Sequence, residues 1–177
     1  MSPFIPIRGL HHFAYRCRDA EETRVFYEDL LGLPLTHIVR AETIPSTGEY
    51  CPYVHLFFEM TDGSSMAFFD LGDNTASEPS PNTPRWANHI ALRVDSADAV
   101  LNALARLQAA GVEVIGPVDH DGFVLSIYFF DPNGIRLELT TNTASVQTLA
   151  QFRRDARPAL DAWTREKATR ASAKVAA

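Results

Sequence analysis

The hydrophobic and polar positions of the chain follow the same order of elements twice. Alternation of apolar and polar residues predicts a strand over 9–17, and the spacing of apolar residues predicts a helix over 20–31 that stops at Gly32. Further strands complete a first β-α-β-β-β unit, at 35–40, 53–60 and 66–71. The order returns in the second half, as a strand at 88–94, a helix ending at Ala110 and strands at 112–115, 124–130 and 135–140. The chain is therefore expected to hold two copies of one module.

The two copies also share residues at identical offsets. The segment His12-Phe-Ala-Tyr-Arg returns as His89-Ile-Ala-Leu-Arg, and each module opens on its histidine. Two modules related by a pseudo-twofold axis can face their sheets inward and enclose a cavity. The duplication therefore predicts that pseudo-symmetry brings His12 and His89 together, which is a simple way to build a metal site.

The pattern also divides the chain into segments. A polar segment with three prolines, 73–86, separates module one (about 9–72) from module two (about 87–143), so we expect one two-module domain over 1–143. A long loop is predicted at 41–52, and a charged helical extension at 144–177, interrupted at Pro158. The expected fold class is α+β, with two βαβββ modules in a pseudo-twofold arrangement followed by this extension.

Composition excludes several classes of function. The 177 residues are 46% hydrophobic and 21% charged, which indicates a globular protein. The net charge of -6 and the lack of a basic stripe argue against nucleic-acid binding. There is no apolar run long enough to span a bilayer and no signal-like N-terminus, so we expect a cytoplasmic protein. Two cysteines, Cys17 and Cys51, are too few for a disulfide scaffold, and Cys17 is expected to be buried.

Candidate metal chemistry centres on three side chains. Glu138 is an acid between two leucines on an alternating strand, so it faces either solvent or a polar site. If it shares a cavity with His12 and His89, the set is two imidazoles and one carboxylate. Such a set leaves coordination positions for substrate and O2 on Fe(II), or for substrate on Mn, Zn or another divalent ion. His55, on the third strand, either lines this cavity as a substrate contact or packs within the sheet.

Three separated motifs carry a resemblance to a known family. The segments that begin at Gly9 and Asn88, and the segment 126–139 with Asp131-Pro-Asn-Gly before Glu138, are similar to those of the vicinal oxygen chelate superfamily. That superfamily includes glyoxalase I, extradiol dioxygenases, fosfomycin-resistance thiol transferases and bleomycin-binding proteins. The resemblance covers residues 9 to about 141 and implies that His12, His89 and Glu138 are metal ligands. It also implies a homodimer, in which the modules pair either within one chain or between two.

One departure from the family's sequence pattern and one match to it narrow the expected activity. The family often has a fourth ligand, an acid on the last strand of the first module, and alignment places Phe68 there, as a substrate-pocket residue in place of a ligand. The stretch from Val118 to Glu138 resembles the extradiol signature, which implies that His120 shuttles protons and that Tyr128 orients a substrate hydroxyl. Without a catalytic role, His120 would be a solvated loop residue and Tyr128 would be a core residue.

Three functions are consistent with these residues. The first is an extradiol-type dioxygenase that cleaves an aromatic diol or hydroquinone with O2, with Fe(II) favoured over Mn, Zn, Ni or Co. The second is a non-redox lyase, isomerase or thiol transferase that uses a divalent metal as a Lewis acid. The third is a metal-free binding protein for a small hydrophobic ligand.

Overall fold

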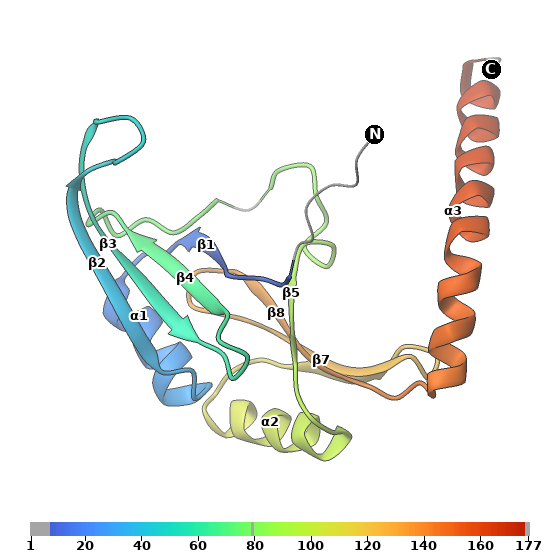
Figure 1. The fold of residues 1–177 in the computed structure, drawn as a ribbon, viewed down its shortest axis with the longest axis horizontal. Coiled ribbons are helices and arrows are strands. Elements are labelled where there is room, and N and C mark those ends of the chain that lie inside the picture. Colours follow the sequence, from blue (N-terminus) through green and yellow to red (C-terminus); the bar gives the residue numbers. More distant parts are fainter. Residues whose placement is uncertain (1–7, 79, 176–177) are drawn as a thin grey trace.

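The computed structural model describes residues 8–78 and 80–175, and it contains two four-stranded sheets (Figure 1). Module one consists of β1 (His12–Arg16), α1 (Ala20–Arg24), the π-helical η1 (Val25–Leu30), β2 (Leu35–Thr43), β3 (Tyr50–Glu59) and β4 (Ser65–Asp70). Module two consists of β5 (Ile90–Arg93), α2 (Ala97–Ala109), β6 (Ile115–Asp119), β7 (Val124–Phe130) and β8 (Arg136–Asn142). The helix α3 (Val146–Val175) follows. The predicted α+β class with two βαβββ modules is thus confirmed.

Both sheets have the same topology. Their strand orders are β1-β4-β3-β2 and β5-β8-β7-β6, and in each the first strand of the module pairs parallel with the last. The remaining pairs are antiparallel. This topology places the residues that follow each opening histidine directly beside the closing strand, which positions Ala91 opposite Glu138.

Several predicted boundaries shift. The loop expected at 41–52 is shorter, because β2 and β3 pair as far as Thr43 and Tyr50. Pro52 lies within β3 at a register shift between Ala41 and Thr43, where its missing N–H is tolerated. The strand expected at 112–115 instead begins at Ile115, since Val112 and Val114 pack against the core before strand pairing starts. The alternating apolar residues Val112 and Val114 therefore indicate packing against the core and not strand pairing.

The helical segment of module one joins the two modules. Its cap, Asp19, accepts a hydrogen bond from the backbone N–H of Glu22, as predicted. Its buried face carries Tyr27, whose hydroxyl donates to Asp131 Oδ2 of module two over 2.9 Å. Asn133 Nδ2 donates to the hydroxyl of Thr23, so two buried polar contacts connect this segment to the β7–β8 turn. Burial raises the pKa of both Asp131 and Tyr27.

The C-terminal helix α3 extends away from both sheets (Figure 1). It continues through Pro158, so the expected interruption there was wrong. The surrounding residues are exposed, and water can therefore solvate the carbonyl whose hydrogen-bond donor proline lacks. Phe152 contacts Phe123 near the start of the helix, with ring centroids 5.7 Å apart. Across residues 8–78 and 80–175, every helix is too short or too polar to cross a membrane.

One glycine is needed where β6 begins. Gly116 has φ +125, and a Cβ there would lie 2.9 Å from the carbonyl oxygen of Ser126. We expect Gly116→Ala to lower the free energy of unfolding by about 2 kcal/mol or more, because both the backbone and β7 must move. Urea unfolding measures this. Gly9→Ala, which meets nothing within 4 Å, is the matched control, and equal effects of the two changes would contradict the prediction.

The two thiols are predicted to differ in reactivity. Cys17 is fully buried, and burial raises its pKa to about 11, whereas Cys51 is partly exposed. With iodoacetamide at pH 8, we expect the native protein to alkylate at Cys51 and at least about 100-fold more slowly at Cys17, because the thiolate is the nucleophile. Mass spectrometry after a timed quench checks this, and denatured protein should alkylate at both. Fast labelling of native Cys17 would contradict the burial that the fold implies.

Candidate metal centre

A histidine and a carboxylate meet on the sheet of module two. His89 lies just before β5 and Glu138 lies on β8, and the parallel pairing of these strands brings the two side chains together. His89 Nε2 lies 3.0 Å from Glu138 Oε2. Glu138 is only 5% exposed, so its carboxylate is withdrawn from water.

The remaining atoms of both side chains are held by neighbours. His89 Nδ1 lies 3.1 Å from the carbonyl oxygen of Ala87, and because a carbonyl only accepts, this contact places the ring proton on Nδ1. Glu138 Oε1 accepts hydrogen bonds from the hydroxyls of Ser126 over 2.5 Å and Tyr128 over 3.2 Å. Nε2 and Oε2 then face each other with lone pairs, an arrangement that requires a shared proton or cation. The donor set therefore fits a divalent metal ion.

A second imidazole extends this group toward the surface. The exposed His120 has its Nε2 2.7 Å from the hydroxyl of Tyr128, which is 8% exposed. Burial, followed by the charge of Glu138, raises the pKa of the Tyr128 phenol. The structure thus places His120, Tyr128, Glu138 and His89 in one continuous group, with a path for a proton from the carboxylate to the surface.

His12 lies on the other sheet, in an aromatic and histidine-rich environment. Its ring centroid is 5.4 Å from that of Phe57 and 6.1 Å from that of His55. His12 Nδ1 lies 2.7 Å from Nδ1 of His11, which leaves its Nε2 available. His55 stacks on Phe69 with centroids 3.7 Å apart, and its Nδ1 contacts the carbonyl oxygen of Phe68. Burial lowers the pKa of His55, which favours the neutral imidazole.

His12 and the His89–Glu138 pair do not meet within one chain. Among residues 8–78 and 80–175, no three or more His, Cys, Asp or Glu side chains are grouped closely enough to hold a metal ion. His89 and Glu138 form one pair, and His12 lies with His55 on the sheet of module one. The three-ligand set expected from the sequence therefore stays a prediction that a single chain does not assemble.

The prediction that Phe68 lines the substrate pocket was wrong. Phe68 is fully buried and its ring lies 4.8 Å from that of Tyr27, on the face of the sheet that packs against the helical segment. Strand register identifies the true counterpart of Glu138. Ala91 pairs with Glu138 in module two, and the equivalent Ala14 pairs with Ala67 in module one. A methyl group cannot ligate a metal, so module one contributes no carboxylate at this position.

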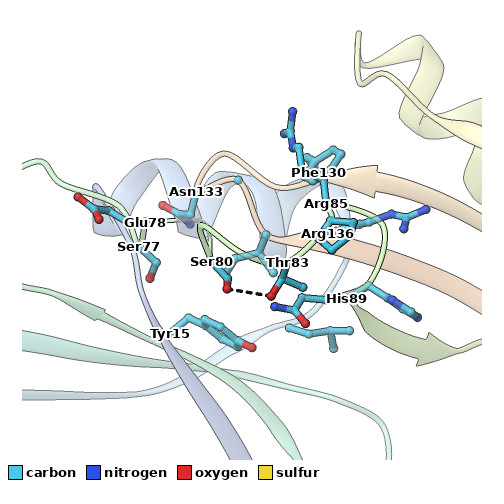
Figure 2. Close-up of a pocket in the computed structure, with 15 residues that line it drawn as sticks. Tyr15, Ser77, Glu78, Ser80, Thr83, Arg85, His89, Phe130, Asn133 and Arg136 are labelled. Carbon is cyan, nitrogen blue, oxygen red and sulfur yellow. Dashed lines mark hydrogen bonds between the residues drawn. The ribbon is translucent and has the colours of Figure 1, made fainter. Parts of the chain in front are cut away.

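Sequence reasoning missed several residues of the site. Ser126, which holds Glu138, is a polar residue two positions before Tyr128 on an apolar strand, and alternation alone places both on one face. Phe69 is opposite His55 in the register of β3 and β4. A pocket beside His89 is lined by Arg85, Arg136 and Tyr15, among others, and the two arginines and His89 gather at one side of it (Figure 2).

Comparison with solved structures identifies the fold. A glyoxalase/dioxygenase from Nostoc punctiforme is similar at 22% identity and a TM-score of 0.58, covering 81% of this chain and 99% of that one. A mutant of the fosfomycin resistance protein FosX from Listeria monocytogenes, complexed with Mn(II) and a dihydroxypropylphosphonic acid, is similar at 22% identity and a TM-score of 0.56, covering 80% of this chain and 97% of that one. TnmS3, an antibiotic binding protein from Streptomyces sp. CB03234, has 23% identity and a TM-score of 0.50, covering 78% and 99%.

Comparison of sequences identifies the family. No curated protein matches the chain significantly. The family model of the Glyoxalase/Bleomycin resistance protein/Dioxygenase superfamily matches residues 9–139, which is most of both modules and leaves out α3. The chain therefore belongs to the Glyoxalase/Bleomycin resistance protein/Dioxygenase superfamily.

Proposed function

We propose that this protein is a metal-dependent enzyme whose ion is held by His89 and Glu138 of one copy and His12 of a second copy. The observation that carries the proposal is the 3.0 Å approach of His89 Nε2 to Glu138 Oε2. The other atoms of both groups are already hydrogen-bonded, so these two lone pairs remain for a cation.

The need for a second copy follows from how the modules join. Within the chain they meet through Tyr27, Thr23 and the β7–β8 turn, and this joint uses the helical face of the first sheet. His12 and His55 lie on the opposite face of that sheet, since Phe57 beside them alternates with the core residue Phe58. A twofold-symmetric pair of chains would lay this face over the His89–Glu138 pair of the partner and form two equal sites.

The reaction that these residues support best is an extradiol-type cleavage of an aromatic diol or hydroquinone. Fe(II) in the site would supply binding for O2 and for the vicinal oxygens of the substrate. Tyr128 would hydrogen-bond a substrate hydroxyl, and His120, whose Nε2 lies 2.7 Å from the Tyr128 hydroxyl, would pass its proton to solvent. His55, Phe57 and Phe69 would contribute an aromatic wall for the substrate ring from the other copy.

A second candidate is a non-redox enzyme that uses Mn(II) or Zn as a Lewis acid. It is supported by the fold shared with FosX, which is complexed with Mn(II) and a phosphonic acid. In this case Tyr128 and His120 would donate or accept a proton at the substrate oxygen without O2.

Metal content and oxygen uptake separate the candidates. The protein is purified anaerobically and loaded separately with Fe(II), Mn(II) and Zn(II), and the metal bound per chain is measured by mass spectrometry. The dioxygenase proposal expects one ion per chain and O2 uptake with a catechol in the Fe(II) form alone. Turnover without O2 in the Mn(II) or Zn(II) form would support the second candidate. No bound metal in a folded, metal-saturated sample would contradict both and would favour a metal-free binding protein.

A further inference from the structure

We propose that the substrate carries an oxyanion, a carboxylate or a phosphonate, which Arg85 and Arg136 bind. This inference deepens the proposed function and rests on it for the reaction that follows binding. Arg85, Arg136 and His89 all line one pocket, and the three residues lie at the same end of it (Figure 2).

Arg136 lies two residues before Glu138 on β8. The two residues are at positions i and i+2 of β8, so their side chains leave the same face of the sheet, and their Cα atoms are about 6.6 Å apart. Arg136 pairs with Phe130 across the sheet, as Glu138 pairs with Tyr128. A small molecule bound to a metal at Glu138 would therefore lie on the same face of the sheet as Arg136.

Both guanidinium groups are held in place by aromatic rings. The Cζ of Arg136 lies 4.3 Å from the centroid of Tyr128, and the Cζ of Arg85 lies 4.5 Å from the centroid of Phe130. Tyr128 and Phe130 are at positions i and i+2 of β7, so their side chains leave the same face of the sheet. The two stacked pairs therefore lie side by side on that face. Arg136 Nη1 also donates to the carbonyl oxygen of Trp86 over 2.5 Å. Stacking and this bond fix the plane of the guanidinium and leave other N–H groups free to donate.

Neither arginine is neutralised by the protein. Within the described part of the chain, Arg85 and Arg136 form no salt bridge, whereas Arg16, Arg18 and Arg24 each pair with a carboxylate. One acid, Glu78, lines the same pocket, and it lies on the side away from the arginines (Figure 2). Each of the two guanidinium groups is held by a ring and is unpaired, and each presents a planar set of N–H donors that suits the oxygens of a carboxylate or phosphonate.

The binding step is tested without metal, so that its outcome is independent of the proposed reaction. Metal-free protein is titrated calorimetrically with benzoate, phenylphosphonate and neutral benzyl alcohol, at low salt. We expect benzoate or phenylphosphonate to bind, benzyl alcohol to bind much more weakly, and Arg136→Gln or Arg85→Gln to weaken anion binding about 10-fold or more. The stronger of the two anions identifies the headgroup.

Matched variants keep this test decisive. Arg153→Gln removes an exposed arginine of α3 and should leave anion binding unchanged. Arg136→Lys retains the charge without the planar fork and should weaken binding less than Arg136→Gln. Equal anion affinity in the wild type and in a folded Arg85→Gln/Arg136→Gln variant would overturn the inference.

A kinetic comparison links the arginines to the reaction. If the Fe(II) form is active, we expect Arg136→Gln to lower kcat/KM at least about 10-fold more for 3,4-dihydroxybenzoate than for catechol, and the exposed α3 change Arg153→Gln to alter neither value. Anion binding by a protein that takes up no metal when it is saturated with Fe(II), Mn(II) or Zn(II) would contradict the proposed function alone. Metal binding and turnover without any effect of the arginine changes would contradict this inference alone.

Discussion

Mixing His12→Ala chains with Glu138→Ala chains should restore about a quarter of the wild-type metal sites, although neither variant binds metal alone. Each site of the proposed dimer takes His12 from one copy and His89 with Glu138 from the other. Random exchange makes about half of the dimers mixed, and each mixed dimer holds one intact site and one doubly altered site. Restoration therefore tests directly whether two chains share a site.

The experiment uses co-expression of two differently tagged chains and purification through both tags. Mixed dimers isolated in this way should bind about one metal ion per two chains, and the parent variants should bind the metal at least about 100-fold more weakly than wild type. The matched control is a mixture of His89→Ala with Glu138→Ala. In the proposed dimer both residues of a site come from the same copy, where His89 Nε2 and Glu138 Oε2 lie 3.0 Å apart. Every site in these mixed dimers therefore lacks one of the two ligands, and metal binding should not recover.

Two results would contradict this prediction. Full metal binding by the His12→Ala variant would remove His12 from the ligand set. Mixed dimers that form but bind no metal would show that the third ligand comes from elsewhere. Loss of dimers in either parent variant would be visible by size-exclusion chromatography and would be separated from loss of the ligand.

Asp131→Ala should lower the free energy of unfolding by about 3–5 kcal/mol, because it leaves several buried donors without an acceptor. Asp131 Oδ1 accepts the backbone N–H of Asn133 over 2.9 Å and that of Ile135 over 2.8 Å. Its Oδ2 accepts the Tyr27 hydroxyl over 2.9 Å and Asn133 Nδ2 over 3.1 Å. One carboxylate thus shapes the β7–β8 turn and ties it to the helical segment of module one.

A smaller change at the same joint separates these two roles. Tyr27→Phe removes only the hydrogen bond that Asp131 accepts from module one and should lower the free energy of unfolding by about 1–2 kcal/mol. Urea unfolding followed by circular dichroism measures both variants, with Glu42→Ala as an exposed acidic control that should change the value by less than about 0.5 kcal/mol. An Asp131→Ala variant as stable as this control would show that the joint does not hold the modules together.

Local pattern was enough to predict the elements and half of the site. Alternation and the repeat predicted both modules, because strand and helix periods depend on neighbours in sequence. The strand β7 was predicted with its observed bounds, 124–130. Tyr128 and Glu138 lie across one short hairpin, so their meeting depends mainly on a local turn, and His120 precedes that strand by only a few residues.

Register and module packing required the tertiary structure. Alternation separates the faces of β4 but does not say which of its residues lies opposite Ala14. Alignment of motifs therefore predicts Phe68 at the position that strand register gives to Ala67. The sequence repeat predicts that His12 and His89 meet. Long-range contacts through Tyr27 and Asp131 decide which faces of the two sheets are joined. Those contacts leave His12 on one sheet and the His89–Glu138 pair on the other. The sequence by itself thus determined two modules that each open on a histidine. Only the three-dimensional packing decided that His12 lies on one sheet and the His89–Glu138 pair on the other, because it depends on contacts between residues far apart in the sequence.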